Sequence, residues 1–133
     1  MNVNAKRYVL RNIIDYAIVN AMSSAIARKL ESIQQKSAMR SVDVANLLGK
    51  RPETVSRWNQ GRAFPRPDAQ KLLLDLEYIA DQLSDFYEPT DVRLWLFSRQ
   101  KLLNGEIPAE LIQKGRANEV IAVIDQLRDG VFI

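Results

Sequence analysis

The 133-residue chain contains neither cysteine nor histidine. Without cysteine it can form no disulfide and no thiolate metal site. Without histidine it lacks the commonest general base and metal ligand of proteins, so no Ser-His-Asp or Cys-His catalytic centre can be assembled. Carboxylate pairs such as Asp81 and Asp85 are four residues apart, which is typical of a solvated helix face. We therefore expect a protein that is not an enzyme and has no metal and no cofactor.

Long apolar runs are also absent. The most apolar stretch, residues 8–26, is interrupted by Arg11 and Asp15, which is unlike a membrane span. It also lacks the continuous apolar run of a signal peptide. We expect a cytoplasmic protein without membrane contact, and the chain length predicts one domain or two small modules that share a core.

Charge is distributed unevenly along the chain, although the formal net charge is only +3. Residues 28–66 contain nine basic and three acidic residues, whereas residues 67–133 contain seven basic and twelve acidic residues. A basic surface suits the phosphates of nucleic acid. An acidic surface is repelled by DNA and is better suited to a protein partner. The charges therefore predict two functional halves, although solvated helix faces would explain either half alone.

Residues 41–61 contain two short helical patterns separated by a glycine. Val42, Ala45 and Leu48 recur at three-residue steps, which gives the first pattern an apolar face. Gly49 can then turn the chain with a positive φ. Two short amphipathic helices joined by a tight turn form a helix-turn-helix, whose second helix can lie in the major groove of DNA.

The second helical pattern begins at Pro52, which suits the first position of a helix, and ends at Gly61. Val55 and Trp58 form its inward stripe, so its polar side chains face solvent, where they can read base edges or contact phosphates. Arg57 is the expected base contact. The predicted DNA-binding residues are Lys50, Arg51, Glu53, Thr54, Ser56, Arg57, Gln60, Arg62 and Arg66. The alternative is an ordinary helical hairpin with a buried tryptophan.

This segment resembles the Xre/Cro-type helix-turn-helix. Ala45 is the small residue at the helix crossing, Gly49 lies in the turn, and residues 54–61 form the motif TVSRW-x-x-G. The resemblance implies binding to a double-stranded DNA operator. Because one helix-turn-helix makes too few contacts for useful specificity, we expect a homodimer on an inverted repeat. Arg51 cannot cap the second helix with an acceptor, so an inhibitor that does not bind DNA remains an alternative.

Helices are predicted on both sides of the helix-turn-helix, and the expected fold class is all-α. Residues 6–35 carry apolar rows at helical spacing, which one continuous helix or two helices broken near Ser24 would satisfy. A long helix follows Asp68. Its apolar residues recur at heptad spacing, which favours a core helix over a dimer seam; they are Leu72, Leu76, Ile79, Leu83 and Phe86. We divide the chain into an N-terminal DNA-binding module, residues 1–67, and a C-terminal module, residues 68–133.

Three short helical patterns follow this long helix. The first covers residues 91–100, the second opens at Pro108 and stops at Gly115, and the third is closed by Gly130. The chain then ends on three apolar residues, 131–133. Such an end either folds back as core, which the pattern favours, or contacts a partner.

The order of motifs in this half resembles the toxin-binding domain of Xre/MbcA/ParS-type antitoxins: RLWL, LNGEIPAELI, KG, an Ile- and Val-rich helix, and DGVF. The resemblance covers residues 91–133. It implies an antitoxin of a type II toxin–antitoxin pair that represses its own operon and blocks the active site of a RES-domain toxin that consumes NAD⁺. The matched positions that it implies for toxin binding are Arg93, Trp95, Leu96, Asn104, Gly105, Ile107, Pro108, Gly130, Val131 and Phe132. A stand-alone repressor of the phage type, whose second half only oligomerises, is a further alternative.

Overall fold

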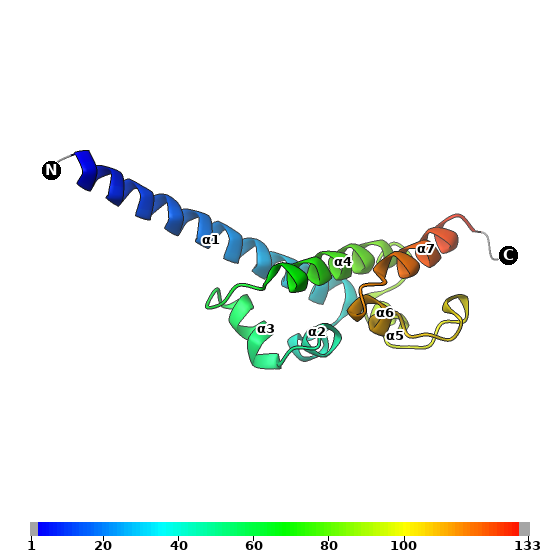
Figure 1. Cartoon of the computed structure of the whole chain (residues 1–133). Coiled ribbons are helices and arrows are strands. Elements are labelled where there is room, and N and C mark those ends of the chain that lie inside the picture. The colour runs from blue at the N-terminus through cyan, green and yellow to red at the C-terminus, as the bar shows by residue number, and fades with distance from the viewer. Residues whose placement is uncertain (1–2, 131–133) are drawn as a thin grey trace.

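The computed structural model describes residues 3–130, and their regular structure is helical (Figure 1). The predicted all-α fold is confirmed. One isolated antiparallel bridge joins Gln100 to Glu106. In chain order the helices are α1 (Val3–Ser37), α2 (Ser41–Leu48), α3 (Pro52–Asn59), α4 (Pro67–Leu83), α5 (Pro89–Leu96), the 3₁₀ helix η1 (Lys101–Leu103), α6 (Pro108–Gln113) and α7 (Ala117–Arg128).

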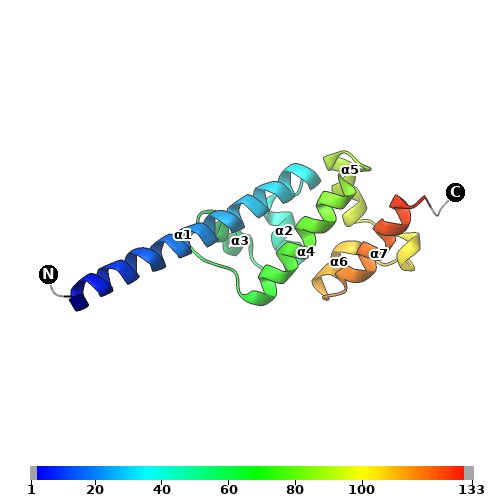
Figure 2. The same ribbon diagram turned by 90° about the horizontal axis from the view of Figure 1, so that it is seen from above.

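Helix α1 is continuous, which decides between the one-helix and two-helix alternatives left open by the sequence. No glycine or proline precedes Gly49, so the composition of this region contains no helix breaker. The helix ends at Ser37 and is followed by Ala38, which has a left-handed backbone conformation with φ of 52°. Its first buried residue is Ile26, and everything from Lys6 to Met22 is exposed. Its N-terminal half therefore projects from the body as a rod (Figures 1 and 2).

Helix α4 is the central element of the body. It lies between α1 on one side and α6 and α7 on the other (Figure 2). Of the predicted inward row, Leu76, Ile79 and Leu83 are fully buried, so α4 is a core helix. Two members of the row were predicted wrongly: Leu72 is only partly buried, its place being taken by Leu73, and Phe86 lies beyond the end of α4 and is 40% exposed. The core is one cluster of buried side chains that extends from α1 to α7. Both proposed modules contribute to it, and the division at residues 67/68 stays a prediction.

The region after α5 differs from its predicted helix over residues 91–100. Helix α5 ends at Leu96, and the amide side chain of Gln100 folds back to donate to the carbonyl oxygen of Trp95 at 2.9 Å. The backbone of Gln100 then pairs with that of Glu106, and the turn between them passes through Asn104 and Gly105. Both have positive φ, at 56° and 80°. The local helical pattern is overridden by these hydrogen bonds across the loop.

Candidate DNA-binding and protein-binding surfaces

The predicted helix-turn-helix is present as α2 and α3. Gly49 joins them with φ of 67°. This left-handed backbone conformation is strained for any residue with a Cβ atom, which is why glycine is favoured in the turn. Val55 is fully buried and Trp58 is 4% exposed, as the inward stripe of α3 predicts.

The apolar face of α2 differs from its prediction in one residue. Val42 is 37% exposed, whereas Val44 and Leu47 are buried. The reason is that α2 packs against α3, α4 and α6 together, so its buried surface is wider and is rotated from the three-residue row that the sequence suggested.

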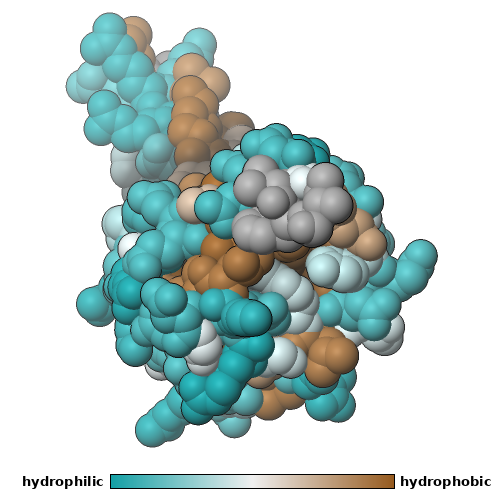
Figure 3. Space-filling model, turned by 90° about the vertical axis from the view of Figure 1, so that its right-hand side faces the viewer, coloured by the Kyte–Doolittle hydropathy of each residue, from teal (hydrophilic) through white to brown (hydrophobic). Residues whose placement is uncertain are grey.

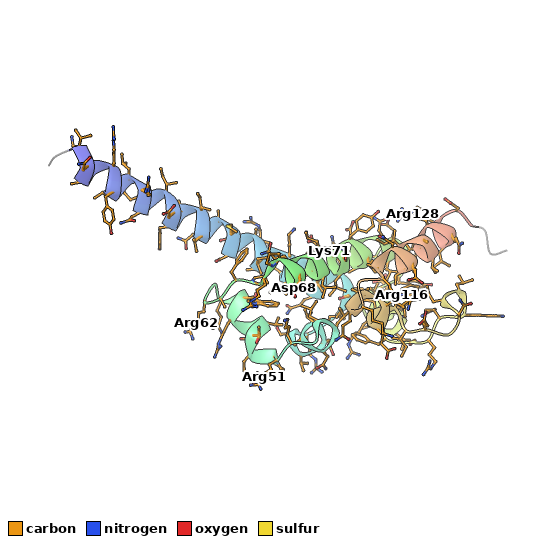
Figure 4. All side chains as sticks on the ribbon, viewed as in Figure 1. Arg51, Arg62, Asp68, Lys71, Arg116 and Arg128 are labelled. Atoms are coloured by element: carbon orange, nitrogen blue, oxygen red, sulfur yellow. The ribbon has the colours of Figure 1, made fainter. Side chains whose placement is uncertain are left out.

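The outer face of α3 presents the predicted DNA-binding residues to solvent. Seven of them are exposed, namely Lys50, Arg51, Glu53, Arg57, Gln60, Arg62 and Arg66. Thr54 and Ser56 are half-buried. Figure 4 shows Arg51 and Arg62 near opposite ends of α3, both pointing away from α4. The predicted residues therefore lie around one helix, and whether they bind DNA stays a prediction.

The five basic residues of this face are not neutralised by any carboxylate of the described residues. Within residues 3–130, Lys50, Arg51, Arg57, Arg62 and Arg66 take part in none of the ion pairs. By contrast, arginines elsewhere, such as Arg116 and Arg128, each contact a carboxylate. Unneutralised cations on one face can each displace a counterion from a phosphate.

Sequence reasoning missed the contribution of α2 to this surface. Arg40, Ser41 and Val42 line a surface hollow of about 610 Å³ together with α3 residues that include Ser56 and Arg57. Arg40 is largely exposed, with 79% of its side chain accessible. Its position directly before α2 was the available signal, because the first helix of a helix-turn-helix crosses the DNA backbone.

A salt bridge joins the helix-turn-helix to the C-terminal half. The Asp43 carboxylate on α2 accepts hydrogen bonds from Arg93 Nε at 3.2 Å and Arg93 Nη2 at 3.0 Å. It also accepts one from the backbone N–H of Arg40 at 2.9 Å. The Asp43 side chain is 10% exposed and that of Arg93 is 44% exposed. The hydrogen bonds from Arg93 hold the pKa of Asp43 below its ordinary value, against the opposing effect of burial.

Replacing Asp43 with asparagine should lower the free energy of unfolding by about 1–2 kcal/mol, since Arg93 is partly solvated and the loss is screened. The carboxylate's contribution is fully present above the ordinary aspartate pKa of about 3.9 and is lost as pH falls through the lower folded pKa. Urea unfolding from pH 7 to pH 3 should therefore show the gap between wild type and Asp43→Asn closing in acid. The exposed Asp125→Asn is the control, and a gap that does not change with pH would contradict the assignment.

The residues matched to the toxin-binding motif occupy different depths. Arg93, Trp95, Gly105 and Ile107 are half-buried, while Asn104 and Gly130 are exposed. Leu96 and Pro108 are buried, so they can shape this surface but do not present a side chain to a partner in this conformation. Val131 and Phe132 lie outside the described residues.

A hollow of about 340 Å³ lies at Trp95. Leu94, which is 65% exposed, contributes to its lining. The remaining lining residues are Tyr87, Asp91, Ser98 and Gln100. Figure 3 looks onto the C-terminal end of the body, where apolar patches interrupt the polar surface. An apolar hollow with a carboxylate at its edge suits a partner that inserts an apolar side chain beside a basic one.

The loop that carries Asn104 and Gly105 is held in place by Arg116. The guanidinium Nη2 donates to Glu106 at 3.2 Å and to Glu119 at 2.8 Å. The hydrogen bond to Glu119 is the main reason that the pKa of Arg116 is raised above its ordinary value. Arg99 also donates to the carbonyl oxygen of Gly105 at 3.0 Å. These polar contacts fix the shape of the loop together with two apolar anchors, the buried Leu103 and the partly buried Ile107.

Residues 3–130 contain neither a membrane-spanning helix nor a group of side chains suited to a metal ion. None of their helices is long and apolar enough to cross a membrane. They also contain no cluster of three or more acidic, histidine or cysteine side chains arranged to hold a metal ion.

Comparison with known proteins gives relatives over nearly the whole chain, although no protein-family model matches it. The mycobacterial cidal antitoxin MbcA, from Mycobacterium tuberculosis and from Mycobacterium bovis, is 29% identical over 115 residues, which are 86% of this chain and 98% of MbcA. A probable mycobacterial cidal antitoxin of M. tuberculosis is 27% identical over 117 residues, which are 84% of this chain and 100% of that protein.

The fold is also similar to that of a chain in the crystal structure of the M. tuberculosis MbcT-MbcA toxin-antitoxin complex. The TM-score is 0.72 at 28% identity, and the match covers 80% of this chain and 96% of that one. Sequence and structure therefore agree over the helix-turn-helix and the C-terminal half together. The chain is a homologue of MbcA, which confirms the resemblance to Xre/MbcA/ParS-type antitoxins predicted from its motifs.

Proposed function

We propose that this chain is the antitoxin of a type II toxin–antitoxin pair. It neutralises a RES-domain toxin that degrades NAD⁺ and represses its own operon by binding double-stranded DNA as a homodimer in the cytoplasm. The observation that supports this most strongly is the match to 98% of MbcA, together with the fold shared with a chain of the MbcT-MbcA complex.

The toxin-binding surface that we propose lies on α5 and on the loop held by Arg116. Trp95 and the exposed Leu94 provide the apolar hollow, and Asn104 and Gly105 form the turn beside it. Leu96 and Pro108 are buried and contribute indirectly, because they hold α5 and the start of α6 in position. The acidic character of residues 67–133 suits a basic toxin surface.

The operator-binding surface that we propose is the outer face of α3. Its five unpaired cations surround the helix, and Arg57 lies in the last turn of α3, where it could form a bidentate hydrogen bond with a guanine. Arg40, at the start of α2, adds a phosphate contact that the sequence pattern did not suggest. Two copies on an inverted repeat would supply the contacts that one helix-turn-helix lacks.

Co-expression with the neighbouring open reading frame tests the proposal. The two proteins should co-purify, and growth and cellular NAD⁺ should fall when the neighbour is expressed alone and recover when this chain is added. A neighbour that is harmless alone, or whose toxicity this chain leaves unchanged, would sink the antitoxin proposal. A gel shift on the upstream DNA separates the alternatives, because a stand-alone repressor binds DNA without a partner protein and a pure inhibitor does not bind DNA.

A further inference from the structure

The projecting part of α1 carries an apolar stripe that no other described segment covers. Leu10 is 58% exposed, Ile13 58% and Ile14 56%, and every residue from Lys6 to Met22 is exposed. Figure 3 shows apolar surface running along this rod where it recedes behind the body. Monomeric proteins rarely expose a contiguous apolar patch of more than a few hundred Å². Most helices in proteins gain their stability from packing an apolar face, which the projecting part of α1 does not do within the described chain.

The stripe faces away from the body of its own chain. The buried face of α1 runs through Ile26, Leu30 and Ile33, at helical spacing. Continued toward the N-terminus, at about 100° per residue, that face passes through Asp15 and Asn12, and also through the exposed Tyr8 and Val19. The stripe lies on roughly the opposite side, through Leu10, Ile13, Ile14, Ala17 and Ala21. The body therefore cannot cover the stripe while α1 stays straight, and a second molecule is required.

We propose that the second molecule is another copy of this chain, packed antiparallel along α1 with the two-fold axis between Ile13 and Ile14. The stripe is complementary to itself in this register. Leu10 of each copy lies over Ala17 of the other, so a large side chain meets a small one at both ends of the seam. Ile13 meets Ile14 at the centre. The spacing of three and four residues along the stripe is that of a two-helix seam.

Charge selects the antiparallel arrangement over the parallel one. Lys6 and Arg7 lie near the N-terminus of α1, and its first turn contains no acidic residue. A parallel pair would place these cations beside their copies, together with the positive ends of both helix dipoles. In the antiparallel register Lys6 faces Ala21 and Arg7 faces Asn20, and the two dipoles oppose each other.

The length of the rod agrees with the same register. The rod from Val3 to Met22 has its midpoint within one residue of the proposed axis, so two rods that cross there overlap along almost their full length. At 1.5 Å per residue the overlap is about 30 Å. The first residues of α1 in each copy then lie near Ser23 of the other copy, beside Gly61 at the end of its helix-turn-helix. The large apolar side chains of the stripe itself are Leu10, Ile13 and Ile14, 56–58% exposed, and Val9 and Ile18 lie on its two flanks. Removing them from water would favour association.

Sedimentation of the purified full chain, without DNA or toxin, tests the dimer. The wild type should be a dimer at micromolar concentration, and Ile13→Lys should raise the dimer dissociation constant at least 100-fold. Asn12→Lys, the same charge change on the opposite face, should leave the dimer intact, and tryptophan fluorescence should show the body folded in both variants. A wild type that is monomeric at 100 µM, or that dimerises only with a toxin present, would overturn the proposal.

Cysteine cross-linking tests the register, because the native chain contains no cysteine. A mixture of Leu10→Cys and Ala17→Cys, allowed to exchange subunits and then oxidised, should form the mixed disulfide in preference to either homodisulfide. Efficient Leu10–Leu10 cross-linking would instead indicate a parallel pair. The α1 seam rests on the homodimer of the proposed function, but the two can fail separately. A dimer that binds neither DNA nor toxin would contradict the proposed function and leave the α1 seam intact.

Discussion

Replacing Arg57 with alanine should lower operator affinity by about 100-fold or more. A bidentate arginine–guanine contact contributes roughly 1–3 kcal/mol, and a symmetric dimer makes the contact in both half-sites. Arg57 is exposed and unpaired in the described chain, and Val55 and Trp58, not Arg57, anchor α3 in the core. The variant should therefore remain folded. Gel shifts of wild type and variant on the upstream DNA of the operon provide the measurement.

The matched control is Lys101→Ala, which removes the same charge in the loop after α5, at the other end of the body from α3 (Figure 1). It should leave operator affinity within a factor of two. Salt gives a second readout. If the dimer neutralises about six phosphates, log K should fall with log salt at a slope near −5, and Arg62→Ala should reduce that slope by about two. A wild-type slope near zero would exclude DNA binding of this kind, and equal losses for Arg57→Ala and Lys101→Ala would remove Arg57 from the interface.

Removing Val131–Ile133 should abolish neutralisation of the toxin. The resemblance to Xre/MbcA/ParS-type antitoxins implies that the terminal segment blocks access to the toxin's active site. The deletion should not disturb α7, because the capping bonds of that helix end at the N–H groups of Asp129 and Gly130, which stay in the chain. Cells that express the toxin with the shortened antitoxin should stop growing and lose NAD⁺, as cells with the toxin alone do.

A variant with three serines in place of residues 131–133 keeps the length of the terminal segment but removes its apolar side chains. If apolar contacts with the toxin are needed, this variant should also fail to neutralise the toxin. Operator binding by both variants should match that of the wild type, which shows that the protein is present and folded. Growth and NAD⁺ at wild-type levels with the deletion would contradict the role of the tail. In that case α5 and the loop held by Arg116 would have to account for neutralisation alone.

The parts of this fold that are predictable from sequence are those with local signals. The boundaries of α2 and α3 follow from Gly49, Pro52 and Gly61. The last two helices stop just before Gly115 and Gly130, as their sequence patterns predict. Each signal acts within a few residues of its position, so no knowledge of tertiary contacts is needed. The surface of α3 follows directly, since burying Val55 and Trp58 leaves the opposite face to solvent.

The parts that escape sequence reasoning depend on contacts between distant residues. Asp43 and Arg93 are separated by 50 positions, and nothing local indicates that they meet. Arg93 is assigned to toxin binding through the resemblance, yet the structure places its guanidinium on α2, and a contact with the toxin stays a prediction. The end of α5 at Leu96 and the turn at Gly105 likewise depend on pairing between Gln100 and Glu106.

In the proposed dimer, the length of the continuous helix α1 would set the distance between the two helix-turn-helix units. In the proposed dimer the two Ser23 positions, each next to a helix-turn-helix, are separated by roughly 30 Å, close to the 34 Å between successive major grooves. A single residue inserted into the rod would lengthen it by 1.5 Å and rotate everything beyond it by about 100°. Single insertions and deletions between Leu10 and Ala21 should therefore be poorly tolerated, while many exposed substitutions there leave the spacing unchanged. The number of residues in this segment would be under stronger selection than the identity of most of them.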